Sequence, residues 1–148
     1  MYASTTLNAT PTDLGGATAG TAQVSNLCLS CHDGTVSVFS MYRTPVAGAP
    51  TFSAGAVIDA SGKLISGANL GASLTDDHPV NFAYNAALAT ADGGLVTPAS
   101  ASQVVAGIPL YGATVQCASC HNVHDPAYDP FLRADNTGSA LCLKCHVK

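Results

Sequence analysis

The sequence predicts a mostly irregular polypeptide with short helices and a few short β-hairpins. Its 148 residues include 14 glycines and 8 prolines, which interrupt regular structure, and few segments show the 3.6-residue apolar period of a helix. Its six cysteines fall into three Cys-x-x-Cys pairs, a spacing that favours a helical turn at each pair. A chain of this length normally forms one domain, so we expect a single domain over residues 1–148.

The expected elements follow one another in a simple order. Residues 1–27 are rich in Thr, Ala, Gly and Asn and predict an extended arm, a candidate assembly segment. Residues 56–67 carry β-favouring side chains on both sides of a Ser-Gly turn and predict a small hairpin. Residues 93–116 predict one or two further short strands, interrupted by Pro98 and Pro109. Helices are expected to be short and to lie at the three cysteine pairs.

Charge and hydropathy argue against two classes of protein. The chain has five Lys and Arg against nine Asp and Glu and no basic run, which argues against nucleic-acid binding. No apolar run approaches the roughly 18 residues of a transmembrane segment. Charged residues make up 9% of the chain, against about 25% in an ordinary soluble domain. We therefore expect partner subunits to cover much of the surface, or another group to solubilise it.

One five-residue pattern occurs three times, as CLSCH at 28–32 (motif 1), CASCH at 117–121 (motif 2) and CLKCH at 142–146 (motif 3). No cysteine lies outside these motifs, and histidine follows each pair at once although the chain has only five histidines. A zinc site or a disulfide framework explains the cysteine pairs but does not require that histidine, and a redox dithiol would occur once. The pattern therefore predicts covalent attachment of haem c, with zinc as the alternative.

The spacing within each motif suits this chemistry. Cysteines at i and i+3 lie one helical turn apart and reach the two vinyl groups of one porphyrin, while a histidine at i+4 lies over the same face and reaches the iron. We expect three covalently bound haem c groups, which would themselves form the core of the domain. The cysteines and the proximal histidine are Cys28, Cys31 and His32 for haem 1, Cys117, Cys120 and His121 for haem 2, and Cys142, Cys145 and His146 for haem 3.

Two histidines remain for the three distal axial positions, and we expect both to bind iron. His124 follows His121 by only three residues, too few to carry the backbone round the porphyrin edge. His124 is therefore expected to bind a haem other than haem 2, in this chain or in the next. His78 precedes Pro79, which favours an extended backbone that presents the ring. Asp76 or Asp77 is a candidate hydrogen-bond acceptor for the outer ring nitrogen of His78, and the two are equally consistent with a solvated turn.

The last axial position lacks a histidine. Candidates are Met41, Met1 through its sulfur or α-amine, a histidine of a neighbouring subunit, or no protein ligand. Exchange of histidines between identical subunits conserves their number, so one position per chain stays without histidine in a symmetric array.

The position of the chain in the cell follows from the haem chemistry. Haem c is attached outside the cytoplasm, and the start of the sequence has neither the basic region nor the apolar core of a signal peptide. The numbering is therefore expected to describe a mature, exported chain. Haems 2 and 3 are attached 25 positions apart (Cys117 and Cys142), so we expect them to be neighbours.

The phrases LCLSCHDGTVSV, DDHPVNF, VQCASCHNVHDP, FLR and LCLKCH resemble exported multihaem c-type cytochromes with the doubled Cys-x-x-Cys-His motif. Within that group, the chain is similar to the small subunits of extracellular cytochrome filaments. The resemblance covers roughly residues 24–42, 74–84 and 115–147. It implies head-to-tail polymerisation of identical subunits and a continuous stack of haems that carries electrons over long distances outside the cell.

The resemblance also implies roles for individual residues. It makes His32, His121 and His146 proximal ligands and matches His78 and His124 to distal positions. Filament subunits commonly carry more haems, all with two histidine ligands, so three haems with five histidines depart from the pattern of the family.

Two classes of function remain. The first is an electron-transfer protein without substrate chemistry, whose partners are identical subunits and either redox proteins or extracellular electron acceptors. Within this class a soluble periplasmic shuttle is the alternative to a filament subunit, and the few surface charges favour the filament. The second class is an enzyme, for example a reductase acting at a haem with an open axial site. Five basic residues in the whole chain offer little to bind an anionic substrate.

Overall fold

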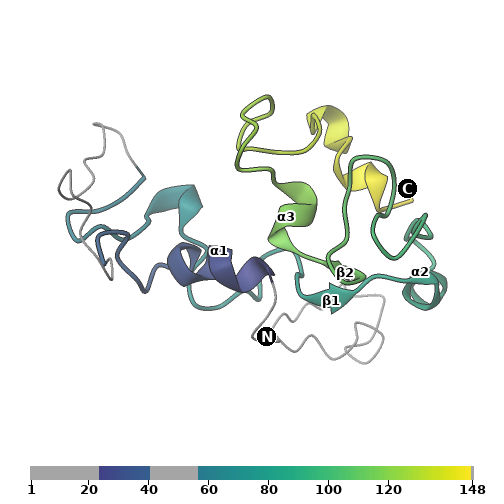
Figure 1. The fold of residues 1–148 in the computed structure, drawn as a ribbon, viewed down its shortest axis with the longest axis horizontal. Coiled ribbons are helices and arrows are strands. Elements are labelled where there is room, and N and C mark those ends of the chain that lie inside the picture. The colour runs from purple at the N-terminus through teal and green to yellow at the C-terminus, as the bar shows by residue number, and fades with distance from the viewer. Residues whose placement is uncertain (1–23, 41–56, 148) are drawn as a thin grey trace.

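The computed structural model describes residues 24–40 and 57–147 (Figure 1). Its elements are helix α1 (Val24–His32), 3-10 helix η2 (Ser66–Ala68), strand β1 (Phe82–Ala83), helix α2 (Ala86–Asp92), strand β2 (Thr114–Val115), helix α3 (Cys117–Cys120), and 3-10 helices η3 (Thr137–Ser139) and η4 (Cys142–Lys144). Turns and irregular segments make up most of the rest, as predicted. Three of the helices coincide with the three motifs, which confirms their expected location.

Helix α1 corrects the boundary of the expected N-terminal arm. The helix begins at Val24, so residues 24–27 are helical rather than extended. The remainder of that arm, residues 1–23, lies outside the described residues. In the part of the chain that the structure describes, no helix has both the length and the apolar character needed to cross a membrane.

The hairpin expected at 56–67 is confirmed for the described residues 57–65. Ile58 and Leu64 form an antiparallel bridge, and the Asp59 amide donates to the Lys63 carbonyl over 2.9 Å. The turn needs glycine at position 62, because its φ is 80° and a side chain there would clash with the ring of Phe39.

A two-stranded antiparallel sheet places the segment containing His78 alongside motif 2. Phe82 of β1 pairs with Val115 of β2, and the Asn81 amide donates to the Val115 carbonyl over 2.8 Å. Strand β2 lies within the 93–116 segment where short strands were expected. Helix α3, which carries motif 2, starts two residues after β2 ends. The pairing of β1 with β2 therefore fixes the position of the segment that precedes β1, which contains His78, relative to motif 2 (Figure 1).

Helix α2 has clear start and stop signals that the sequence analysis did not use. The side chain of Asn85 accepts from the Leu88 amide over 2.9 Å, and Gly93 ends the helix with φ 73°. The helix buries Leu88 and Ala89.

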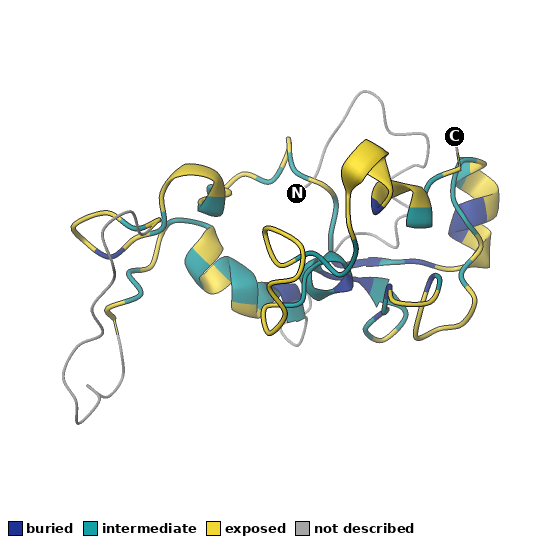
Figure 2. Cartoon of the chain, turned by 90° about the horizontal axis from the view of Figure 1, so that it is seen from above, coloured by how far each residue is buried: buried dark blue, intermediate teal, exposed yellow. Residues whose placement is uncertain are grey.

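The polypeptide builds an apolar core of its own between residues 82 and 141, which revises the expectation that the haems alone form the core. The buried cluster consists of Phe82, Tyr84, Leu88, Val104, Ile108, Leu110, Val115 and Leu141. Cys120 and Cys145 pack against it, so one cysteine each of motif 2 and motif 3 is anchored on this core. Buried positions gather over the strands, α2, the start of α3 and the segment 104–110, while most of the hairpin and loop 122–131 are exposed (Figure 2).

Candidate functional site

Motif 1 occupies the second half of α1. Cys28 and Cys31 are one turn apart, and the helix ends at His32. Just beyond it Gly34 adopts φ 71° and its amide donates to the Cys31 carbonyl over 3.1 Å. This geometry agrees with that predicted for haem 1, with both cysteines and the histidine on one short helix.

Motif 2 forms the single turn of α3, but its histidine lies outside the helix. Gln116 precedes the turn. Its backbone amide donates to Ser119 Oγ over 3.0 Å, and this bond caps the start of the helix. His121 follows with extended dihedral angles (φ −108°, ψ 143°) and forms a bridge with Leu132. His121 is the C-cap of the turn, and its backbone amide donates to the Cys117 carbonyl over 3.0 Å, so the predicted i+4 spacing from Cys117 is kept. The chain turns into an extended conformation only from this histidine onward, where it pairs with the returning chain.

Motif 3 begins in the single turn of η4 and ends in strand-like pairing. The Val96 amide donates to the Cys145 carbonyl over 2.8 Å, and Leu95 forms an antiparallel bridge with His146. The Tyr84 hydroxyl donates to two carbonyl oxygens, that of Val96 over 2.8 Å and that of Cys145 over 3.2 Å. The His146 amide also donates to the Cys142 carbonyl over 3.0 Å, so His146 keeps the predicted i+4 spacing from Cys142, while its backbone pairs with the 94–96 segment.

Three histidine rings share one hydrogen-bond pattern. The Nδ1 atom lies 2.8 Å from the Ala68 carbonyl in His32, 2.9 Å from the Pro79 carbonyl in His78, and 3.0 Å from the Pro130 carbonyl in His121. A carbonyl oxygen can only accept, so each Nδ1 carries the hydrogen and each Nε2 keeps its lone pair. Metal-bound histidines are oriented in this way, with the outer nitrogen donating to a carbonyl or carboxylate. The three rings are thus in the tautomer that binds iron through Nε2.

For His78 this pattern corrects the expected partner. The acceptor of its Nδ1 hydrogen is the carbonyl of Pro79 rather than the carboxylate of Asp76 or Asp77. The extended backbone that Pro79 favours brings this carbonyl within reach of the ring, which leaves the two aspartates with the solvated-turn interpretation.

Thiols of successive motifs lie close enough to raise one another's pKa. The pKa of the Cys28 thiol is raised, first by burial and then by the neighbouring Cys117 thiol, with which Cys28 shares a hydrogen bond. Burial, followed by the neighbouring Cys120 and Cys142 thiols, raises the pKa of the Cys145 thiol to about 11. Motif 1 thus meets motif 2 through Cys28 and Cys117, and motif 2 meets motif 3 through Cys120. The spatial order of the motifs is 1–2–3, with motifs 2 and 3 next to each other on the apolar core.

Buried hydrogen bonds fix the contact between α1 and α3. Ser25 donates from its amide over 3.0 Å and from Oγ over 2.7 Å to Gln116 Oε1. The Cys117 amide in turn donates to Ser25 Oγ over 2.9 Å. The sequence analysis did not single out Ser25, Gln116 or Tyr84, although these residues position the motifs. Only Gln116 carries a local signal, as the capping residue one position before the motif.

The side chains around the motifs fit a covalently bound porphyrin. All six cysteines lie in the described residues with free thiols, two per motif, as the two vinyl groups of one haem require. Large apolar side chains beside the motifs are exposed, among them Leu27 at 77% and Leu143 at 48%. A flat apolar ring attached at each motif would cover such surface. The bound group would supply the one-electron chemistry of iron, and the chain supplies its attachment, its axial ligands and its surroundings.

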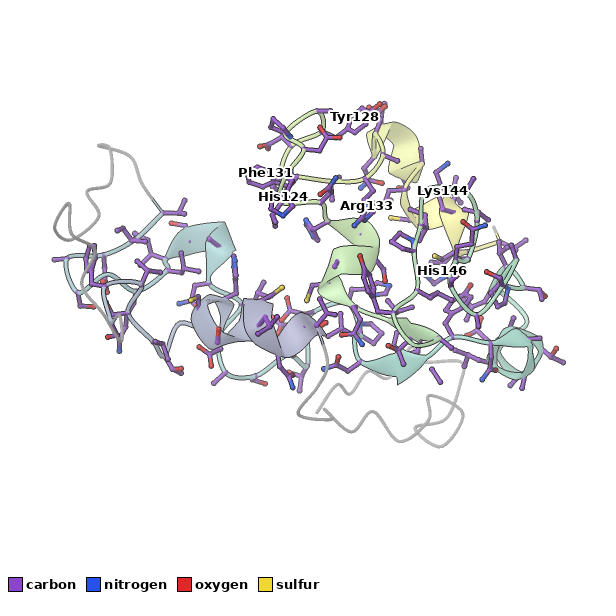
Figure 3. The ribbon with its side chains drawn as sticks, viewed as in Figure 1. His124, Tyr128, Phe131, Arg133, Lys144 and His146 are labelled. Atoms are coloured by element: carbon purple, nitrogen blue, oxygen red, sulfur yellow. The ribbon has the colours of Figure 1, made fainter. Side chains whose placement is uncertain are left out.

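The other candidate ligands are His124, Met41 and Met1. His124 is on the exposed loop 122–131 beyond α3, near Phe131, and the Asn122 amide closes the loop with a 2.7 Å bond to the Phe131 carbonyl (Figure 3). Met41 and Met1 lie outside the described residues. For the zinc alternative, no group of three or more His, Cys, Asp or Glu converges on a metal position within 24–40 and 57–147.

Comparison with known proteins supports the haem interpretation. Residues 112–148, about a quarter of the chain, match the family described as the doubled CXXCH motif. The match covers α3, η4 and both of their motifs, but not motif 1. It supports a multihaem c-type cytochrome, with haem c and its iron bound covalently and a role in electron transfer. A search of the curated proteins finds no match to the chain.

Proposed function

We propose that this protein transfers electrons through three haem c groups as the repeating subunit of an extracellular filament, without substrate chemistry of its own. The close approach of successive motifs carries the electron-transfer part of the proposal: Ser25 of α1 accepts from the Cys117 amide, and Cys120 and Cys145 pack on one apolar core. Thioether bonds at Cys28 and Cys117, and at Cys120 and Cys142, would anchor neighbouring porphyrins by adjacent edges. Short distances between porphyrins are what rapid electron hopping requires.

Two separate apolar surfaces support the filament. One lies on the hairpin, where Val57 is 50% and Ile65 38% exposed, and the other lies on loop 122–131, where Val123 is 68% and Phe131 46% exposed. The hairpin is at the end of the molecule away from α2, whereas loop 122–131 stands above α3 (Figure 1). A head-to-tail contact joins two different surfaces of the same subunit in this way. The low share of charged residues, 9%, agrees with a surface that other subunits cover.

The partners and the location follow from this proposal. Identical subunits would contact one another end to end, and electrons would enter from redox proteins and leave to extracellular acceptors. The chain would be exported and would work at the cell surface or outside the cell.

Cryo-electron microscopy of the holoprotein, combined with charged substitutions on the hairpin, tests the filament. We expect Val57→Glu with Ile65→Glu to abolish filaments while leaving the haem content unchanged, because a carboxylate at an apolar contact is left unpaired. Thr97→Glu, a charge at another exposed position, should leave filaments intact. Wild-type protein that stays monomeric at every concentration while exchanging electrons would contradict the filament and favour the shuttle. Turnover of nitrite would instead favour a reductase.

A further inference from the structure

We infer that His78 and His146 are the two axial ligands of haem 3, the haem attached at Cys142 and Cys145. The structure brings these two rings together with their centroids 6.3 Å apart and their planes at 78°. The inference rests on haem binding at motif 3, which is part of the proposed function, and is independent of filament assembly.

The separation of the rings matches a pair that shares one metal ion. A metal–imidazole bond is about 2 Å long. The bonded nitrogen lies roughly 1 Å from the ring centroid, because the ring bonds are about 1.3–1.4 Å. Two imidazoles on opposite sides of one iron therefore place their centroids about 6 Å apart. The observed 6.3 Å leaves room for the iron between His78 and His146.

Simple aromatic packing is the competing explanation of this contact. Edge-to-face rings also lie about 4.5–7 Å apart, and they stabilise a protein chiefly where they bury apolar area. His78 is exposed, so such a contact would bury little there. His146 is moreover the histidine of a haem-attachment motif, which gives its ring a metal-binding role that packing does not explain.

Separate backbone interactions hold the two rings in place. His146 is fixed by its bridge with Leu95. His78 precedes β1, whose start is fixed by the 2.8 Å bond from the Asn81 amide to the Val115 carbonyl. Neither arrangement depends on the other ring, so the backbone contacts bring the two histidines together without the bound haem.

The state of the His78 ring completes the geometry. Its Nδ1 hydrogen donates to the Pro79 carbonyl over 2.9 Å, so Nε2 presents a lone pair. The same bond restricts rotation of the ring and raises the basicity of Nε2 toward iron.

The assignment has consequences for the other haems. Haem 3 would take both axial ligands from its own chain. Because His124 is expected on a haem other than haem 2, His124 would then bind haem 1, and the one position without histidine would belong to haem 2. Near-perpendicular imidazole planes also give a low-spin ferric haem a strongly anisotropic EPR signal. We expect that signal from haem 3.

The first test uses the full-length holoprotein and resonance Raman spectroscopy. We expect His78→Ala to convert one haem of the three from low spin to high spin and to abolish the strongly anisotropic EPR signal, and free imidazole should restore both. The matched variant His124→Ala should keep that EPR signal. Loss of the signal in His124→Ala but not in His78→Ala would overturn the assignment.

The second test identifies the haem. In a chain lacking haem 3, made by Cys142→Ala with Cys145→Ala, His78→Ala should add no high-spin haem, whereas His124→Ala should still add one. A new high-spin haem in the His78→Ala chain would mean that His78 binds another iron.

A density map of wild-type holoprotein gives the same answer without these variants, since it shows whether His78 Nε2 contacts the iron of haem 3 or not. If haem 3 is present and His78 is not on its iron, only this inference fails. If no haem is attached at motif 3, the proposed function fails with it.

Discussion

Ser25 and Gln116 lie 91 positions apart in the sequence and form the buried polar contact that joins motif 1 to motif 2. Ser25 is 0% and Gln116 1% exposed, and both donors of Ser25 meet the one side-chain oxygen of Gln116. Because the thiols of Cys28 and Cys117 touch beside this contact, it sets the relation between haem 1 and haem 2.

Replacing Gln116 with Ala should destabilise the holoprotein by about 1–3 kcal/mol, because the buried Ser25 amide loses its acceptor. Denaturant titration followed by circular dichroism measures the free energy of unfolding. Gln103→Ala is the matched control, an exposed glutamine whose loss should cost within about 0.5 kcal/mol. Equal effects of the two substitutions would show that the Ser25–Gln116 contact does not stabilise the fold.

Replacing Tyr84 with Phe should cost about 1 kcal/mol, because the hydroxyl that donates to the Val96 and Cys145 carbonyls is removed. Denaturant titration followed by circular dichroism measures this loss in the free energy of unfolding. Tyr128→Phe, at a side chain that is 44% exposed, should leave stability nearly unchanged. If Tyr84→Phe matches this control, the hydroxyl does not hold motif 3 in place.

Replacing His124 with Ala should turn one low-spin haem high-spin, and that haem should not be haem 2. His124 follows His121 by only three positions, too few to bring both rings to opposite faces of one porphyrin. In a chain without haem 2, made by Cys117→Ala with Cys120→Ala, resonance Raman spectra should therefore still show the change. Its disappearance in that chain would place His124 on haem 2 and refute the geometric argument.

Five histidines for six axial positions should make one haem spectroscopically different from the other two. We expect two low-spin, low-potential haems with two histidine ligands each. The third should have a methionine or an open or weakly ligated position. Methionine raises the potential, because its sulfur stabilises ferrous iron better than imidazole does, and ligation and environment shift haem potentials over about 0.8 V. EPR of the intact protein compares the three. Three indistinguishable bis-histidine signals would require a histidine from another protein.

Sequence reasoning succeeded where the determinants are local. The cysteine spacing predicted helical turns at all three motifs, and the Ser61-Gly62 turn predicted the hairpin whose bridge joins Ile58 and Leu64. The start and stop signals of α2, Asn85 and Gly93, are equally local, and this helix could have been predicted from them.

Features that depend on distant pairing could not be predicted. The backbones of His121 and His146 pair with Leu132 and Leu95, and nothing within the motifs indicates those partners. The contact between Ser25 and Gln116 joins residues 91 positions apart without any periodic pattern. The core residues between 82 and 141 are scattered over irregular segments, so no apolar period marks them.

The mass of the intact, denatured protein tests most directly whether the three motifs attach haem. We expect the mass of the polypeptide plus three haems that survive denaturation, and the loss of one haem from each double variant Cys28→Ala/Cys31→Ala, Cys117→Ala/Cys120→Ala and Cys142→Ala/Cys145→Ala. The mass of the bare polypeptide, of a zinc-loaded chain or of a disulfide-bonded chain would contradict haem attachment at these motifs.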